Sequence, residues 1–238
     1  REAFAGSLIT EVKVPKNLTS IGNGAFGNCP IVSVTVSADN EVYAVDANGN
    51  LYDKKNNVVA MILPALSGEF TFRKDYTYQP QAFQGTKVTK LIIEEGITEI
   101  SEYAFYGMPE LAEVVLPASL KVIGNYAFAN CEKLSVINKP AALTEIGDYA
   151  FANDGFASVT LADGLTKVGN YAFAANKNLK KVDISDTIET FGQYLFADCD
   201  ALEEVNFLGN RTEITGVLSS TDLYMFAGCD GEITLSNP

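Results

Sequence analysis

The sequence predicts a β-rich solenoid, a right-handed ramp in which short coils of similar sequence stack on one another. The first observation behind this prediction is the segment Ile-Gly-Asn-Tyr-Ala-Phe at residues 123–128, which returns in near-copies along most of the chain. From Phe83 to Phe196, successive copies of its phenylalanine are separated by 22, 23, 23, 22 and 23 residues, and a fixed period of this length is typical of stacked structural units. The second observation is the apolar, strand-like segment that accompanies most copies. We therefore expect about nine coils of 22–23 residues in one domain, residues 1–238.

The segment that follows each phenylalanine is expected to contain a strand. In Leu111-x-x-Val114-x-Leu116, apolar residues alternate with residues that point outward, which is the period of a strand buried on one side. The same pattern occurs at residues 9–14, 31–36, 88–93, 156–161, 179–184 and 202–207. Because successive coils run in the same direction, these strands are expected to form a parallel sheet.

The rest of each coil is expected to turn twice more. After a turn that often contains proline, a second apolar pair such as Leu120 and Ile123 lines the next side of the core as a short strand. The stretch at residues 124–131 is too short for a long helix. We interpret it as one turn of α or 3₁₀ helix, opposite the sheet, that inserts its alanine and phenylalanine into the core.

Two segments depart from the repeat. Residues 37–72 are predicted to be an inserted β-meander or hairpin, because Asn48-Gly49 is a tight-turn dipeptide between apolar segments. The acidic and amide residues from Asp46 to Asn50 superficially resemble a calcium loop, but Leu51 stands where an EF-hand requires glycine, so we predict a hairpin turn. Residues 209–222 are expected to lengthen one coil before a last coil caps the stack.

The composition argues against several classes of function. The chain carries 30 acidic against 17 basic residues, a net charge of −13, which disfavours nucleic acid and anionic lipid as partners. It contains no histidine, so a histidine-based catalytic triad or a histidine-ligated zinc site is impossible. No apolar run approaches the roughly 20 residues that span a bilayer. We predict no enzyme activity, no catalytic, metal or cofactor site, and no membrane span in this chain.

The cysteines occupy one repeated position, three residues after the phenylalanine: Cys29, Cys131, Cys199 and Cys229. Other coils carry Met108, Asp154 or Asn176 at this position. We therefore interpret the cysteines as small, buried core residues rather than metal ligands. Because parallel stacking points their side chains in one direction, which is poor geometry for a disulfide, free thiols are predicted.

Two surface stripes are candidate binding sites, and the first is a tyrosine ladder. One tyrosine stands two residues before the phenylalanine in each of five successive coils: Tyr103, Tyr126, Tyr149, Tyr171 and Tyr194. Stacked at the strand spacing of about 4.7–4.9 Å, these rings would form a rail suited to the flat faces of sugars. The alternative, which uniform repetition favours, is that the rings pack on one another and shield the edge of the coils.

The second stripe consists of the outward residues of the strands, which vary from coil to coil. Solenoids use such faces as extended binding surfaces. The predicted partner-binding residues are an apolar cluster and its polar neighbours, namely Ile92, Val115, Val136, Lys90, Glu113 and Asn138. A sheet also tolerates some outward aliphatic residues without any function, and this is the alternative interpretation.

The combined repeat, Ile-Gly-x-Tyr-Ala-Phe-x-x-Cys-x-x-Leu-x-x-Val-x-Leu-Pro, resembles the BspA-like, or Treponema-type, leucine-rich repeat of bacterial surface proteins. The match runs from Phe4 to Leu235, apart from an island between residues 37 and 72. This resemblance implies a curved solenoid with its strands on the concave side, and a location on the cell surface or outside the cell. It also implies a protein or glycan partner, such as a molecule of the host extracellular matrix or cell surface. It implies neither a cofactor nor a catalytic site.

Overall fold

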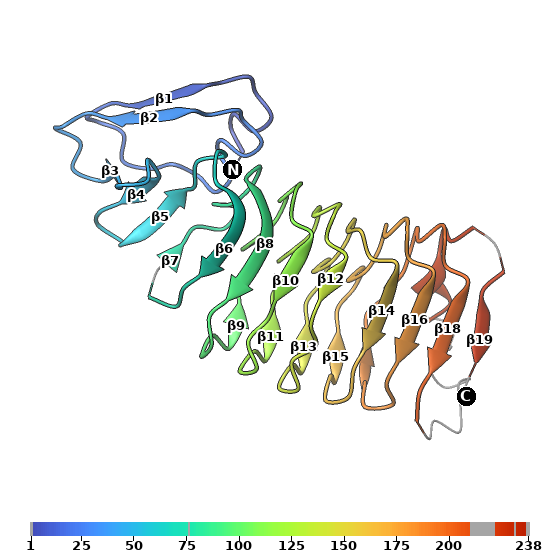
Figure 1. The fold of residues 1–238 in the computed structure, drawn as a ribbon. Coiled ribbons are helices and arrows are strands. Elements are labelled where there is room, and N and C mark those ends of the chain that lie inside the picture. Colours follow the sequence, from blue (N-terminus) through green and yellow to red (C-terminus); the bar gives the residue numbers. More distant parts are fainter. Residues whose placement is uncertain (1, 76, 210–221, 231, 237–238) are drawn as a thin grey trace.

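From residue 67 onward, one strand from each coil contributes to the main sheet. The computed structural model describes residues 2–75, 77–209, 222–230 and 232–236, and it is a parallel β-solenoid of about nine turns with almost no helix (Figure 1). The main sheet contains two four-stranded blocks: β6 (Ser67–Phe72), β8 (Lys87–Ile93), β10 (Glu113–Val115) and β12 (Val136–Ile137), then β14 (Ser158–Leu161), β16 (Lys181–Ile184), β18 (Glu204–Phe207) and β19 (Thr234–Ser236). All pairs within the two blocks are parallel, which confirms the predicted solenoid.

A second parallel sheet lines the next side of the coils. Its five short strands are β9 (Glu99–Ile100), β11 (Val122–Ile123), β13 (Glu145–Ile146), β15 (Lys167–Val168) and β17 (Thr190–Phe191), which confirms the predicted short strands. A glycine follows each of the last four strands where neighbouring coils approach most closely. A Cβ atom on Gly192, for example, would lie 2.2 Å from the carbonyl carbon of Gly169, so a side chain has no room there.

The third side of the regular coils does not contain the predicted turn of α or 3₁₀ helix. Its amides bond alternately within the coil and to the next coil. Ala127 donates to Gly124 of its own coil (3.3 Å), whereas Phe128 donates to Ala150 of the next coil (2.9 Å). Because a helix needs its amides to bond within one segment, this pattern replaces it. In the described part of the chain, the only 3₁₀ helix is η1 (Asp222–Phe226).

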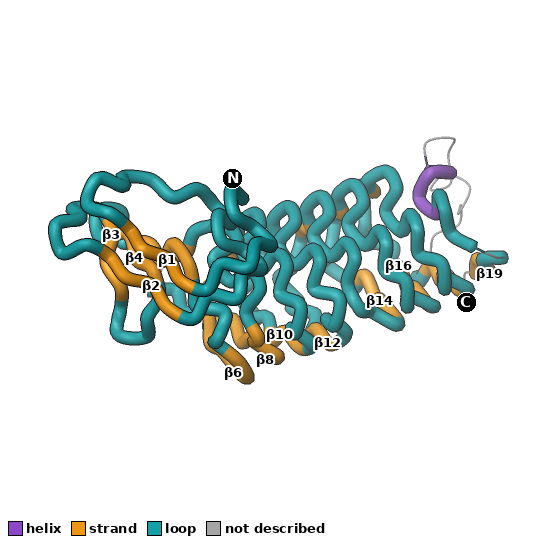
Figure 2. The backbone as a smooth tube through the Cα atoms, turned by 90° about the horizontal axis from the view of Figure 1, so that it is seen from above, coloured by secondary structure: helices purple, strands orange, loops and turns teal. Residues whose placement is uncertain are grey.

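The N-terminal part of the chain forms two further sheets at one end of the stack (Figure 2). The first pairs β1 (Glu11–Val14) with β2 (Ser33–Val36), and the second contains β3 (Tyr43–Val45), β4 (Leu51–Asp53), β5 (Val58–Met61) and β7 (Thr77–Tyr78). The antiparallel pairing of β3, β4 and β5 confirms the predicted meander. These sheets share a hydrophobic core, around Val12, Ile31 and Leu51, that is separate from the core of the following coils.

Of the two predicted departures from the repeat, the first is shorter than predicted and the second lies mostly outside the described residues. Strand β6 lies inside residues 37–72, the range predicted as inserted, but it pairs in parallel with β8 and belongs to the main sheet. The lengthened coil predicted at residues 209–222 falls almost entirely outside the described residues, because residues 210–221 are not described. That lengthening, and the grouping of residues 1–238 into one domain, stay predictions.

The repeated phenylalanines form the centre of the larger core. Phe105, Phe128 and Phe151 stack with ring centroids 5.3 Å apart, and each is at most 3% exposed. The cysteines are free, and three of the four are buried, which confirms the predicted thiols. Their sulfur atoms bond to the preceding coil, as Cys131 Sγ does when it donates to the carbonyl of Phe105 (3.3 Å).

Candidate functional site

The outward residues of the first block of the main sheet lie in two rows, which follow from the strand register. Lys90 of β8 is the partner of Glu113 in β10, and Ile92 is the partner of Val115. Lys90 Nζ lies 3.1 Å from Glu113 Oε1 and 3.8 Å from Glu69 Oε2, so the first row is charged. Such exposed ion pairs contribute little to stability. In the second row, Ile92 and Val115 form a half-buried apolar pair.

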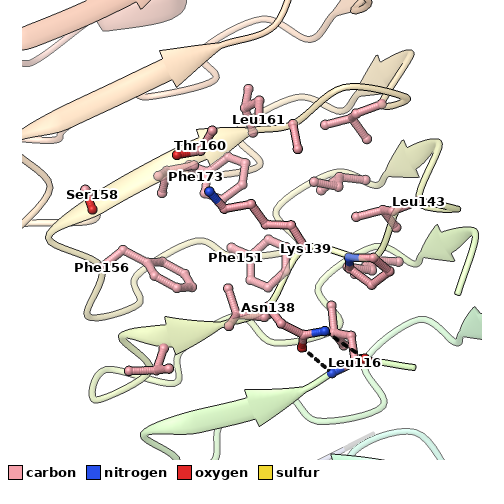
Figure 3. A pocket seen from close by; sticks show the side chains of 18 of the residues that line it. Leu116, Asn138, Lys139, Leu143, Phe151, Phe156, Ser158, Thr160, Leu161 and Phe173 are labelled. Carbon is pink, nitrogen blue, oxygen red and sulfur yellow. Dashed lines mark hydrogen bonds between the residues drawn. The ribbon is translucent and has the colours of Figure 1, made fainter. Parts of the chain in front are cut away.

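The third apolar residue of the predicted cluster, Val136, lies in the charged row. It is the register partner of Glu113 and is 56% exposed. The position beside Val115 belongs to Asn138, whose Oδ1 accepts a hydrogen bond from the Leu116 amide (2.6 Å) and whose Nδ2 donates to the Leu116 carbonyl (2.9 Å; Figure 3). Asn138 therefore joins two coils, and the apolar residues form a diagonal patch instead of one row.

The main sheet is interrupted between β12 and β14, which are neighbours in the stack but do not pair. One coil earlier, the amide that precedes the strand donates to the carbonyl at the same repeat position of the coil before it, as Ser135 does to Ala112 (3.1 Å). At the interruption the donor is Gly155, which bonds to Leu134 (3.0 Å) and starts the next coil in a different register. The two blocks therefore separate on this face, while the second sheet continues from β9 to β17.

Two features of the sequence coincide with this interruption. The coil that begins at Phe151 is one residue shorter than its neighbours, because a single residue separates Asp154 from Phe156. In addition, the last inward position of the strand segment is apolar and at most 4% exposed in five other coils: Ile93, Leu116, Leu161, Ile184 and Phe207. The coil of β12 has Lys139 at this position, and its side chain is exposed. The core therefore lacks one apolar side chain at the interruption.

A pocket of about 280 Å³ lies at this interruption (Figure 3). Its lining includes the core rings of Phe151, Phe156 and Phe173 and the outward hydroxyl side chains of Ser158 and Thr160 on β14. Figure 3 shows the Lys139 side chain extended across the pocket, between Phe151 and Phe173 in this view. Val136 and Asn138, two of the predicted partner-binding residues, also line the pocket. The strand pattern alone did not predict this feature.

The second block of the main sheet presents a polar face. Lys181 Nζ lies 2.9 Å from Glu204 Oε1, and this contact lowers the pKa of Glu204 below its usual value. Asn206 Nδ2 donates to Asp183 Oδ1 (2.8 Å) and to Glu204 Oε1 (2.7 Å). Because these outward residues are charged or polar and bond to one another, the second block offers fewer apolar contacts to a partner than the first.

The tyrosine ladder is assembled as predicted. Its neighbouring rings have centroids 4.7 Å apart and lie within 6° of parallel. Each of the five tyrosines has a backbone φ between 54° and 58°, the left-handed region that favours glycine. Tyr126 is therefore covered on both faces, by Tyr103 and by Tyr149, and its ring edge is the part left for a ligand.

No group of three cysteine, aspartate or glutamate side chains that could hold a metal ion occurs among the described residues. Asp46, in the segment that resembles a calcium loop, accepts the amides of Asn48 and Asn50 with Oδ1 (2.8 Å each) and so closes the hairpin turn. No helix within the described ranges is long and apolar enough to cross a membrane.

The stacked parallel coils define a leucine-rich-repeat solenoid, and solved bacterial structures share this fold. A leucine-rich cell surface protein from Faecalibacterium prausnitzii is 24% identical with a TM-score of 0.56, over 97% of this chain and 54% of that chain. The pneumococcal vaccine antigen PcpA is 20% identical with a TM-score of 0.54, over 100% and 58%. A leucine-rich repeat protein from Bacteroides ovatus is 18% identical with a TM-score of 0.53, over 96% and 60%. The chain thus spans between 54% and 60% of these proteins.

The family follows from the sequence match. The profile of the BspA type leucine rich repeat region matches residues 1–48 and 76–203, in six copies. Because this match covers more than half of the chain, the chain belongs to the BspA-type leucine-rich repeat family, as the repeat pattern predicts. No curated protein matches the sequence significantly.

Proposed function

We propose that the chain is a non-catalytic binding protein, on the surface of a bacterial cell or secreted from it, that holds another macromolecule on its main sheet. The observation that carries this proposal is the diagonal apolar patch of Ile92, Val115 and Val136. Its members lie on three successive strands, and Val136 is 56% exposed. Protein interfaces are commonly built around apolar groups with a polar rim. Membership of the family and the likeness to a cell surface protein support the proposed location.

The partner is a protein or a glycan carrier, such as a molecule of the host cell surface or extracellular matrix. The ion pair of Lys90 and Glu113 (3.1 Å) lies at the edge of the patch. Charged groups at an interface rim mainly tune the association rate and the orientation of the partner. The apolar patch is therefore expected to supply most of the affinity.

The tyrosine ladder is the second candidate, as a glycan-binding site. Sugars stack on exposed faces of aromatic rings, yet the inner rings of this ladder cover one another at 4.7 Å. This geometry favours the structural role, and the ladder therefore ranks behind the main sheet.

Binding to immobilised extracellular-matrix proteins and to a glycan array, measured on one protein sample, tests the proposal. The double variant Val115→Asp and Val136→Asp should abolish binding to the protein that the screen identifies, because both side chains point away from the core. Val32→Asp is the matched control, since Val32 is 70% exposed on the N-terminal end. It should bind normally.

Two outcomes would contradict the proposal. If no macromolecule binds, the proposed function is wrong. If the valine double variant binds normally while Tyr126→Ala with Tyr149→Ala does not, the binding site is the tyrosine ladder. Circular dichroism of every variant shows whether the fold is retained.

A further inference from the structure

The pocket between β12 and β14 lies where the neighbouring coils place a buried leucine side chain. Leu116 and Leu161, the equivalent residues of the neighbouring coils, are buried, and at this position between them the chain has Lys139. A lysine keeps its ammonium group in water, so its stem can cover an apolar cavity but cannot fill it. The aromatic floor shows the effect, because Phe151 and Phe173 are 3% and 4% exposed, whereas Phe128 is completely buried.

We propose that this pocket binds a small monocarboxylate with an aliphatic or aromatic body. The apolar body occupies the vacant core position above Phe151, Phe156 and Phe173, and the carboxylate pairs with Lys139 at the opening. A small molecule can occupy this pocket without the proposed macromolecular partner, and Val136 is the residue that the pocket shares with the apolar patch.

Size and lining determine the apolar part of the ligand. The volume of about 280 Å³ is just below the range of about 300–1,000 Å³ typical of small-molecule sites. Phe151, Phe156 and Phe173 present carbon atoms to the pocket, and small-molecule sites are typically lined by such apolar groups together with a few polar ones. A ligand body that replaces the missing leucine therefore gains contacts that the folded chain itself leaves unmade.

Charge determines the anionic part. Within the described residues, Lys139 forms no ion pair shorter than 4.0 Å. Asp163, the carboxylate in the lining, accepts a hydrogen bond from Ser185 Oγ (2.6 Å) and keeps its negative charge, so the ligand carboxylate is placed at Lys139 and away from Asp163. Ser158 and Thr160, which also line the pocket, carry hydroxyl groups that can donate to a second carboxylate oxygen. A free ammonium beside hydroxyl donors is complementary to an anion, although the chain as a whole carries a charge of −13.

Isothermal titration calorimetry with three probes tests both parts of the proposal on the intact chain. The first probe, 3-phenylpropionate, has the apolar body and the carboxylate. The second, 3-phenylpropanamide, keeps the shape without the charge, and the third, propionate, keeps the charge without the ring. We expect 3-phenylpropionate to bind at least about tenfold more tightly than the amide, which corresponds to one charge-assisted hydrogen bond. It should also bind at least about tenfold more tightly than propionate, because propionate lacks the ring that fills the apolar part of the pocket.

Two variants of Lys139 separate the contributions. Lys139→Leu should fill the cavity, raise the melting temperature and abolish binding of 3-phenylpropionate. Lys139→Gln should keep the cavity but remove the preference for the acid over the amide. Lys121→Gln changes an exposed lysine outside the lining and should leave all affinities unchanged.

The outcomes that overturn the proposal are specific. No measurable binding of 3-phenylpropionate at millimolar concentration overturns it, as does equal binding of the acid and the amide by the wild-type chain. Unchanged binding in Lys139→Leu would place the ligand elsewhere. If Lys139→Leu fails to fold, Lys139→Gln decides, because a retained preference for the acid in that variant contradicts the role of the ammonium.

Discussion

Asp154 Oδ1 accepts a hydrogen bond from the amide of Cys131, 2.9 Å away, whereas its Oδ2 is buried without a partner among the described residues. In the next coil the equivalent side chain, Asn176, donates from Nδ2 to the carbonyl of Phe151 (2.8 Å). By the repeat, the corresponding acceptor for Asp154 is the carbonyl of Phe128. A protonated carboxyl group can donate there, and burial raises the pKa of Asp154 well above its usual value.

Asp154→Asn is therefore expected to stabilise the protein at neutral pH. Because the folded-state pKa is raised, the stability that Asp154 contributes is fully present below the unfolded pKa of about 3.9 and is lost as the pH rises through the folded pKa. Asparagine can make both hydrogen bonds without titrating. The advantage of the variant in free energy of unfolding should grow by about 1.4 kcal/mol per pH unit across this window and then level off.

Urea denaturation of both proteins, from about pH 4 to pH 8, measures this difference. Asp39→Asn is the control, because it makes the same chemical change at an exposed side chain instead of a buried one. A constant difference for Asp154→Asn would show that the native carboxyl group is not held neutral.

Phe128→Ala is expected to destabilise the chain by about 3–5 kcal/mol, because it removes a fully buried ring and leaves a cavity. The ring stacks on Phe105 and Phe151, each at 5.3 Å, so the loss also weakens the contacts between neighbouring coils. Chemical denaturation measures the change. Phe4→Ala, at a ring that is 49% exposed, serves as the control and should cost much less. A loss below about 1 kcal/mol for Phe128→Ala would argue against the phenylalanines as the centre of the core.

The coil itself is predictable from the sequence, because the positions of Phe128, Leu134 and Ile146 recur at a nearly constant period and each has one structural role. The absence of a helical turn after Gly124 is not predictable, since the local sequence is compatible with a short helix. Its absence depends on the amides of Phe128 and its neighbours, which bond to the next coil instead. Such bonds between coils are tertiary interactions and leave no local signal.

The pocket is only partly predictable from the sequence. Its signals are present in the sequence: Lys139 replaces an apolar residue of the repeat, and the coil starting at Phe151 is one residue short. Each signal alone is compatible with an ordinary variable position. Only the structure shows that both coincide with an interruption of the main sheet, between β12 and β14, and that the pocket there reaches the core.

The backbone of the tyrosine ladder predicts that glycine destabilises the protein less than alanine at position 126, which reverses the usual order of these two residues. Tyr126 has a φ of 55°, and at the same position the coil before Phe26 has Gly24, with a φ of 63°. A residue with a Cβ atom in this region is strained by about 1–2 kcal/mol, whereas glycine is not. The ring contacts with Tyr103 and Tyr149, worth about 0.5–1.5 kcal/mol each, offset this strain in the native protein.

Tyr126→Ala loses the ring contacts and keeps the strain, while Tyr126→Gly loses both. We therefore expect Tyr126→Gly to be more stable than Tyr126→Ala by about 1 kcal/mol, although glycine is normally the more destabilising residue. Urea denaturation of the two variants measures the difference. At the neighbouring Asn125, which is not in the left-handed region, the same pair of substitutions should follow the normal order, with alanine more stable. If alanine is also the better residue at position 126, strain is not what the stacked tyrosines offset, and their uniform repetition requires another explanation.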